Sequence, residues 1–198
     1  MSPKPNVSEE RKEQITEAAT KVFAEQGFDK ARMDDIAAEA KLSKGTLYLY
    51  FKSKDAIIKH LLEKLFDREF AALQLIADEP RPASEKLMLF AEKMIGDIHS
   101  WSRFIPIMYE FLGRLFRQSV VQEAFKKYMG LYYDLITPII QQGIDEGEFR
   151  AMDAEEAAVA FGAIFEGTIL LWVYDPERVN LEKNLRASIK LLMDGIIK

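Results

Sequence analysis

A short stretch near the N-terminus decides the fold: Leu42-Ser43-Lys44-Gly45-Thr46-Leu47-Tyr48-Leu49-Tyr50-Phe51-Lys52-Ser53-Lys54-Asp55, in a chain of 198 residues. Ser43 is a favourable N-cap, because its hydroxyl can accept a hydrogen bond from the backbone of the first helical turn. Successive helical residues are about 100° apart, so Leu47 and Phe51 share one side of the helix and Leu49 lies opposite them. The pattern predicts a short helix with one buried side and a large apolar side chain facing outward.

Two more helices are predicted before this stretch. Apolar residues recur at the spacing of one helix face, i, i+3, i+4 and i+7, in residues 15–23 and again in residues 33–40. Gly27 follows the first helix, where a left-handed C-terminal cap needs a residue without Cβ. Two aspartates open the second helix, where their charge suits the helix dipole. The third helix, residues 44–51, follows a short turn, and helices in this order are typical of a helix-turn-helix.

The outward face of the third helix carries the residue types that a DNA major groove requires. Lys44 can donate to guanine, Leu49 can contact thymine methyl groups, and Gly45 lets a phosphate approach the backbone. Tyrosine hydroxyls and a lysine just beyond the helix can reach further phosphates. The alternative is a small three-helix packing module whose tyrosines cover the edges of its core. The predicted DNA contacts here are Ser43, Lys44, Gly45, Thr46, Tyr48, Leu49, Tyr50 and Lys54.

The charge distribution is uneven along the chain. The formal net charge of −5 argues against a nucleic-acid-binding protein, because such proteins tend to be basic. Residues 1–55 are neutral, however, with ten basic and ten acidic side chains. Residues 41–54 contain four lysines and no carboxylate. A local basic patch is what a phosphate backbone responds to, and the alternative is a solvated lysine cluster.

The composition excludes several classes of protein. The chain has no cysteine, so disulfides and thiolate metal sites are excluded. Its two histidines are not in the Glu-x-x-His pairs of di-iron bundles, and no glycine-rich phosphate loop or hydrolase motif is present. We therefore predict neither an enzyme nor a metal or cofactor site. The longest charge-free run, residues 135–144, is far short of the ~20 residues that span a bilayer, and no signal peptide is recognised. A soluble, cytoplasmic protein is expected.

The stretch from Ile15 to Leu61 resembles the DNA-binding domain of the TetR family of bacterial transcriptional regulators. The run Ser-Lys-Gly-Thr-Leu-Tyr-x-Tyr-Phe-x-x-Lys, which begins at Ser43, is far more specific than a generic helix-turn-helix. Residues 145–150 and 166–167 resemble short motifs that are common in the family's second domain. The resemblance implies an all-α homodimer that binds an inverted-repeat operator in double-stranded DNA, usually as a repressor released by a small molecule.

Two positions depart from the pattern of the family. Ala31-Arg32 stands where the family often has a pair of threonines, so the usual hydroxyl cap is missing and Arg32 is the expected phosphate-binding residue instead. Tyr50 stands where histidine is common, and its hydroxyl reaches further. Neither departure threatens the fold, but both prevent a relative's operator from being assigned to this chain.

The remaining residues predict a helical bundle. The fold class expected is all-α, with an N-terminal three-helix domain in residues 1–55 and a larger ligand-binding and dimerisation domain in residues 56–198. Pro106 fits the first turn of a helix, and Pro138 is expected to kink one. The predicted helices are residues 55–77, 84–100, 104–117, 120–143, 154–174 and 181–197.

Aromatic and methionine side chains concentrate in the middle third of the chain. Such a stripe is commonly ordinary core packing, but the resemblance favours an apolar cavity for a hydrophobic or aromatic effector. Glu110 could anchor a ligand, as could His99, Arg103 and Gln141, or it could pair with Arg114. The residues predicted to bind the effector are Trp101, Phe104, Met108, Glu110, Phe111, Tyr128, Tyr132 and Phe165.

The last two predicted helices carry more apolar surface than one core face requires. This pattern predicts a homodimer interface built from two helices of each protomer, and the alternative is one deeply buried helix in a monomer. Glu166 lies inside the apolar stretch and would need a partner if it is buried. The residues predicted at the interface are Phe161, Ile164, Thr168, Trp172, Ile189 and Met193.

These observations combine into a ligand-responsive transcriptional regulator that acts as a dimer, usually a repressor. The helix that begins at Lys54 would connect the two domains, so that a ligand in the bundle could alter the separation of the two recognition helices. Two alternatives stay open: a helical ligand carrier without DNA binding, and an activator of the same family.

Overall fold

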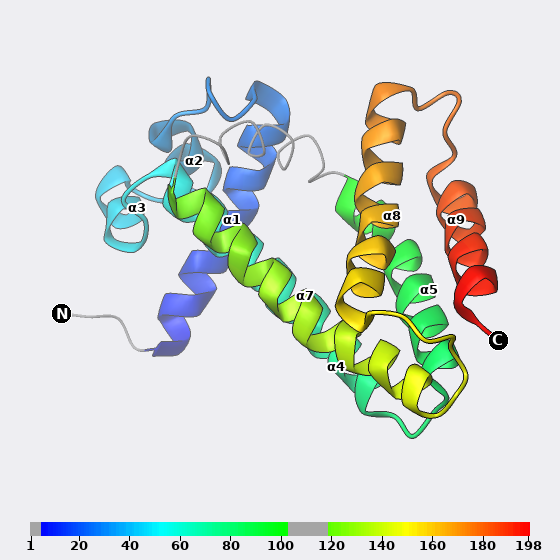
Figure 1. Ribbon diagram of the computed structural model, residues 1–198. Coiled ribbons are helices and arrows are strands. Elements are labelled where there is room, and N and C mark those ends of the chain that lie inside the picture. The colour runs from blue at the N-terminus through cyan, green and yellow to red at the C-terminus, as the bar shows by residue number, and fades with distance from the viewer. Residues whose placement is uncertain (1–4, 103–118) are drawn as a thin grey trace. The chain divides into compact units, whose positions relative to one another are not determined.

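The computed structural model describes residues 5–102 and 119–198, and these residues are organised as α-helices (Figure 1). The all-α class is therefore confirmed. The described helices begin and end within a few residues of the predicted ranges, except that α1 begins at Pro5, well before the predicted pattern in residues 15–23. The helix predicted at residues 104–117, with Pro106, lies outside the described residues. The described helices are α1 (Pro5–Gln26), α2 (Met33–Glu39), α3 (Lys44–Tyr50), α4 (Lys54–Asp78), α5 (Ala83–Ser102), α7 (Ser119–Asp145), α8 (Ala154–Tyr174) and α9 (Leu181–Ile196).

Caps and turns that the sequence predicts set the first three helices. Gly27 has a φ of +76° and its N–H donates to the Phe23 carbonyl at 3.0 Å, which ends α1. The Ser43 hydroxyl accepts from the Thr46 N–H at 3.0 Å and starts α3. Lys41 adopts a φ of +53° in the turn between α2 and α3. A left-handed residue in this turn sharply reverses the chain, which lets α3 pack across α1 and α2.

The core of the three-helix region is small and fully covered. Ile15, Ile36 and Leu47 are each 0% exposed, so all three helices contribute a side chain to one contact region. Ala37 and Ala40 are also buried, so the small side chains of α2 belong to the same core. The core consequently fixes how α3 is presented to solvent.

The chain forms two compact units. The described residues up to Arg68, with a second stretch that ends at Lys126, make one unit, and Glu69–Ser100 with Lys127–Lys198 make the other. The helices α4 and α7 therefore each contribute residues to both units.

The second unit has an aromatic core. The Phe90 ring lies 6.0 Å from the Phe161 ring and 6.5 Å from the Tyr132 ring, both edge-on. The Tyr132 hydroxyl donates to the Ala158 carbonyl at 2.7 Å, so this buried polar group is satisfied. A Cβ on Gly162 would lie 3.0 Å from the same hydroxyl oxygen, which explains why a glycine allows α7 and α8 to pack here.

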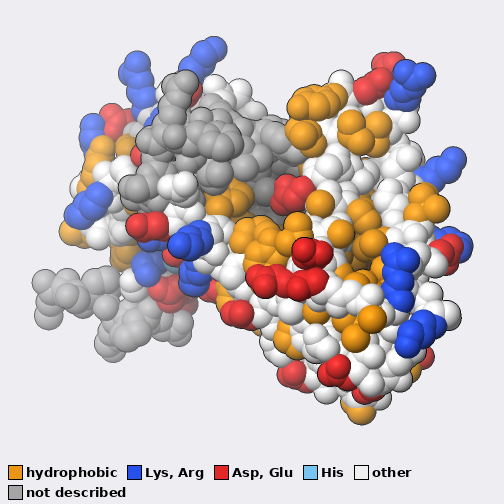
Figure 2. Space-filling view, viewed as in Figure 1, with side chains coloured by type: hydrophobic (Ala, Val, Ile, Leu, Met, Phe, Trp, Pro, Cys, Tyr) orange, Lys and Arg blue, Asp and Glu red, His pale blue; other side chains and the backbone are white. Residues whose placement is uncertain are grey.

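Helix α8 keeps much apolar surface outside this core. It is the one described helix that is long and apolar enough to cross a membrane by length and composition, and only 17% of its most apolar stretch is buried. Side chains on its core side pack inside the unit, whereas Val159, Leu171 and Tyr174 are exposed. Figure 2 shows hydrophobic side chains gathered along α8 and between α8 and α9 on the face in view.

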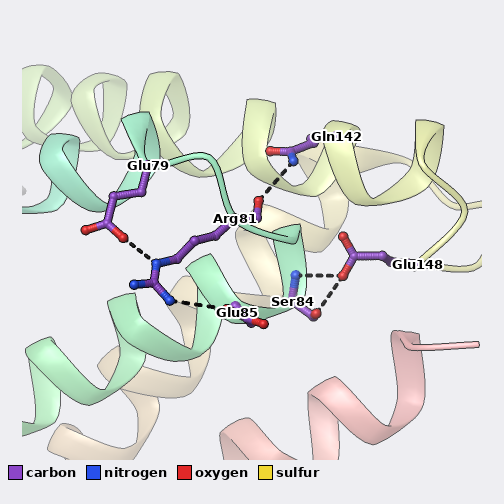
Figure 3. A network of polar contacts seen from close by, with 6 residues as sticks. All are labelled: Glu79, Arg81, Ser84, Glu85, Gln142 and Glu148. Carbon is purple, nitrogen blue, oxygen red and sulfur yellow. Dashed lines mark hydrogen bonds and ion pairs between the residues drawn. The ribbon is translucent and has the colours of Figure 1, made fainter.

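One carboxylate, that of Glu148, joins the start of α5 to the turn after α7 (Figure 3). Glu148 accepts from the backbone N–H groups of Ala83 and Ser84 at 2.7 and 3.2 Å, and also from the Ser84 hydroxyl. The Gln142 amide donates to the Arg81 carbonyl at 3.2 Å beside it. Burial opposes ionisation of Glu148, but these hydrogen bonds outweigh it and lower the pKa of the carboxyl. The start of α5 is thereby capped from a distant turn.

Candidate nucleic-acid interface and effector region

The orientation of α3 agrees with the helical-wheel prediction. Leu47 is 0% exposed and faces α1 and α2, whereas Leu49 is 76% exposed on the opposite side. Lys44 and Gly45 are exposed beside it at the start of the helix, and Thr46 and Tyr48 are partly exposed on its flanks. The structure therefore brings the predicted base-contacting residues onto one accessible face.

The exposed lysine of this face is already paired. The Lys44 ammonium lies 2.8 Å from the carboxylate of Asp34, which is the second residue of α2. The hydrogen bond from Lys44 to Asp34 raises the pKa of the ammonium. The sequence reveals the acidic first turn of α2 but not this contact, because it joins residues on two separate helices.

Two further predicted contact residues have local structural roles as well. Ser43 caps α3, and its hydroxyl lies 2.7 Å from that of Thr46. Arg32 is the exposed residue before α2, and its backbone N–H donates to Asp35 at 3.0 Å. No ion pair of the Arg32 guanidinium occurs among the described residues, so this cation is accessible to a phosphate.

Lys54, a predicted phosphate contact, is the first residue of α4, and its ammonium has partners within the protein. Its ammonium donates to the carbonyls of Phe28 and Asp29 at 2.5 and 3.2 Å and lies 4.5 Å from the centroid of the Phe28 ring. These contacts engage two of its three N–H donors inside the protein. The position therefore fastens the start of α4 to the turn after α1, and sequence spacing carries no signal for that contact.

Several predicted effector residues lie outside the described side chains. These are Trp101, Phe104, Met108, Glu110 and Phe111, and the same holds for the proposed anchors His99 and Arg103. Gln141 is described, and its amide donates to Asp145 at 2.8 Å on an exposed surface.

Of the three effector residues that are described, Tyr132 and Phe165 belong to the buried core, and Tyr128 is partly exposed. Tyr132 and Phe165 are 7% and 9% exposed, and the Tyr128 ring lies edge-on to Phe70 at 5.4 Å. Burial raises the pKa of both Tyr128 and Tyr132, so both phenols stay neutral. The negative charge of Glu166 also contributes to raising the pKa of Tyr128. Although Glu166 keeps an exposed surface, nearby protein atoms desolvate it and raise the pKa of its carboxyl.

Four of the six residues predicted at a dimer interface are buried within a single chain. Phe161 and Ile189 are each 1% exposed, Met193 is 3% exposed and Thr168 is 8% exposed, so they pack the protomer's own core. Ile164 and Trp172 are partly exposed. Apolar periodicity on α8 and α9 therefore does not show which of their side chains reach the surface. The exposed large apolar residues on these helices are Val159, Leu171, Val173, Tyr174 and Leu191.

Two protein-family models match this chain. The family model for bacterial regulatory proteins of the tetR family matches residues 15–61, and the model for the C-terminal domain of BetI-type transcriptional repressors matches residues 83–195. The chain belongs to the TetR family. Its second domain is thus recognisable as well, although single motifs in that part of the sequence are weak.

Several similar proteins match this chain over most of its length. The fatty acid metabolism regulator protein of Bacillus subtilis is 29% identical over 92% of this chain and 94% of its own length. The transcriptional regulator TtgR of Pseudomonas putida is 30% identical over 88% and 85%. The crystal structure of FadR from Bacillus subtilis in complex with stearoyl-CoA covers 93% of this chain and 98% of its own, with 26% identity and a TM-score of 0.79. This TetR-family protein is a transcriptional regulator whose DNA-binding helix-turn-helix is formed by α1, α2 and α3.

Proposed function

We propose that the chain is a ligand-responsive repressor that binds an inverted-repeat operator as a homodimer and is released by a largely apolar small molecule. The observation that carries the proposal is the exposed face of α3. Leu49 is 76% exposed beside Lys44 and Gly45, on a helix whose other side is fully buried. An apolar side chain in such a place is poorly suited to water but well suited to a thymine methyl group. The site of action would be the cytoplasm, where the operator lies.

The apolar surface of α8 and α9 supports the homodimer. A monomer would leave Leu171, Tyr174 and Leu191 in water, and a second copy of the same surface can cover them. A two-fold dimer presents two copies of α3, and each copy would read one half of an inverted repeat. The family model for BetI-type transcriptional repressors supports repression over activation.

The chemistry of the second unit supports an apolar effector. Its core is apolar and includes aromatic rings such as those of Phe90, Tyr132 and Phe161. Bundle proteins bind ligands between helices in mostly apolar cavities with few polar anchors. One similar protein regulates fatty acid metabolism by name, and a related structure holds stearoyl-CoA. A long acyl chain is therefore the first effector class to test.

The release mechanism would act through α4. This helix contributes to both units, and its first residue, Lys54, is fastened to the turn after α1. If the ligand binds more tightly to the conformation in which α4 has one of two positions, it shifts the population of the protein toward that conformation. The two copies of α3 would then no longer match the half-site spacing, which lowers operator affinity.

Selection of DNA from a random pool tests the proposal. The recovered duplexes should contain inverted repeats whose half-sites are about one helical turn apart, and mobility shifts should show one dimer per site. Long-chain acyl-CoA added to the complex should release the DNA. Recovery of no enriched sequence, with acyl-CoA still bound, would favour a ligand carrier instead.

A further inference from the structure

The contact between Asp34 and Lys44 crosses from α2 to the recognition helix. The ammonium and carboxylate are 2.8 Å apart, and the two side chains are 62% and 56% exposed. An exposed ion pair of this kind contributes little to folding stability, because water screens it and two long side chains must be ordered. The pair instead alters the charge of the outward face of α3, because it neutralises Lys44.

The other two carboxylates of α2 are committed elsewhere. Asp35 accepts from the backbone N–H of Arg32 at 3.0 Å and so caps the helix. Glu39 pairs with Lys21 of α1 at 3.3 Å. Among the described residues, Asp34 is the carboxylate that pairs with the recognition helix.

Any DNA group that accepts a hydrogen bond from Lys44 must compete with the carboxylate of Asp34. A phosphate can accept a hydrogen bond from Lys44, but its approach also brings its negative charge close to the carboxylate of Asp34. A guanine edge offers two neutral acceptors, N7 and O6, and it is held in register by the other contacts of α3. The pair therefore opposes an isolated phosphate contact more strongly than a contact with the correct base.

We propose that Asp34 is a specificity-determining residue that keeps Lys44 paired on DNA of arbitrary sequence and releases it at the operator. This inference rests on the proposed function. On non-operator DNA the protein would use one phosphate contact fewer than its lysines allow. On the operator the wild-type protein gives up the pair, which is worth little in the free protein because it is exposed, so removal of the carboxylate tightens operator binding only slightly.

The salt dependence of binding separates these two states. Two probes are required: a duplex recovered by selection, and a shuffled duplex of the same length and composition. For Asp34→Asn we expect binding to the shuffled duplex to tighten roughly fivefold near 0.1 M salt, with the slope of log affinity against log salt steeper by about 0.9. We expect operator affinity to change less than twofold and its slope to stay the same.

A matched control is available on the same helix. Glu39→Gln changes the net charge equally and breaks a similar exposed pair, but it leaves α3 untouched. We expect it to leave the slope on the shuffled duplex unchanged. In a Lys44→Met background, Asp34→Asn should have no effect on either duplex, since the proposed competition then has no lysine to act on.

Three results would overturn the inference while leaving the proposed function intact. The first is an equal effect of Asp34→Asn and Glu39→Gln, which would indicate net charge alone. The second is an equal gain on both duplexes. The third is a loss of operator binding in Asp34→Asn, which would indicate that Asp34 orients Lys44 for the base. If the wild-type protein yields no selected duplex and binds neither probe, the proposed function itself fails. Thermal unfolding of each variant verifies that it is folded.

Discussion

The ammonium group of Lys54 lies over the Phe28 ring, 4.5 Å from its centroid, and donates to the carbonyl oxygen of the same residue. A cation at the first residue of a helix is unfavourable next to the positive end of the helix dipole. Here two carbonyl oxygens and an aromatic face compensate for it. Phe28 is 1% exposed and packs on Phe23 with ring centroids 5.1 Å apart. The start of α4 is thus joined to the core of the DNA-binding domain.

Lys54→Met should destabilise the DNA-binding domain. The substitution keeps an apolar stem but removes two hydrogen bonds and a cation–π contact, for an expected loss of about 1–2 kcal/mol in the free energy of unfolding. Urea denaturation followed by circular dichroism measures this. Lys52→Met is the control, because Lys52 is exposed and, among the described residues, its ammonium donates to the Tyr48 carbonyl of its own turn. The salt slope of operator binding should be unaffected by Lys54→Met. A decrease of about one phosphate contact would show instead that Lys54 binds DNA directly.

Tyr132→Phe should cost about 1 kcal/mol in unfolding free energy, because it removes the hydrogen bond to the Ala158 carbonyl but keeps the ring in the core. Ligand-induced release of DNA should be preserved, since the hydroxyl is already committed to the backbone. Chemical denaturation and a mobility shift with acyl-CoA provide the two measurements. A folded variant that no longer responds to the ligand would place the hydroxyl in the effector site.

Glu148 should make stability depend on acid pH. The pKa of its carboxyl is lowered in the folded protein from an ordinary value of 4.5, so its contribution is fully present above that pH. The contribution is lost as the pH falls through the lower folded value. The difference in unfolding free energy between wild type and Glu148→Gln should therefore be constant near neutral pH and shrink below pH 4.5. Glu146→Gln, on the same turn, is the control and should show a smaller difference at every pH. A difference that grows in acid would contradict the capping role.

Leu171→Glu should convert the proposed homodimer to a monomer without unfolding the protein. Leu171 is 56% exposed on α8, so a charge is tolerated in the free protomer but not against a second apolar surface. Sedimentation equilibrium reports the mass, and circular dichroism verifies the helices. Leu75→Glu, at a residue 70% exposed on α4, should leave the mass unchanged. Dimers that persist in Leu171→Glu would place the interface elsewhere.

Local signals in the sequence predict most of the fold. The hydroxyl of Ser43, the glycine at position 27 and the periodic apolar residues each act within a few residues, so they can be interpreted without coordinates. The helix predicted at residues 154–174 is observed with the same bounds, and Asp153 caps its start by accepting from the N–H groups of Glu155 and Glu156. The same reasoning placed Leu47 inside and Leu49 outside.

Contacts between separate helices could not be predicted in this way. The pairs Asp34–Lys44 and Lys54–Phe28 join residues that only tertiary packing brings together. Apolar periodicity likewise shows that a side chain avoids water but not which surface covers it. For this reason Phe161 and Ile189 were assigned to a dimer interface, whereas they pack within one chain.

The central claim is that the outward face of α3 binds the operator, and one titration tests it most directly. Fluorescence anisotropy with a selected duplex should give a dissociation constant of about 10⁻⁸ M or tighter at physiological salt for the wild-type protein. The double variant Lys44→Ala, Tyr48→Ala should bind that duplex at least about tenfold more weakly while it unfolds like the wild type. Equal binding by the two proteins would contradict the account.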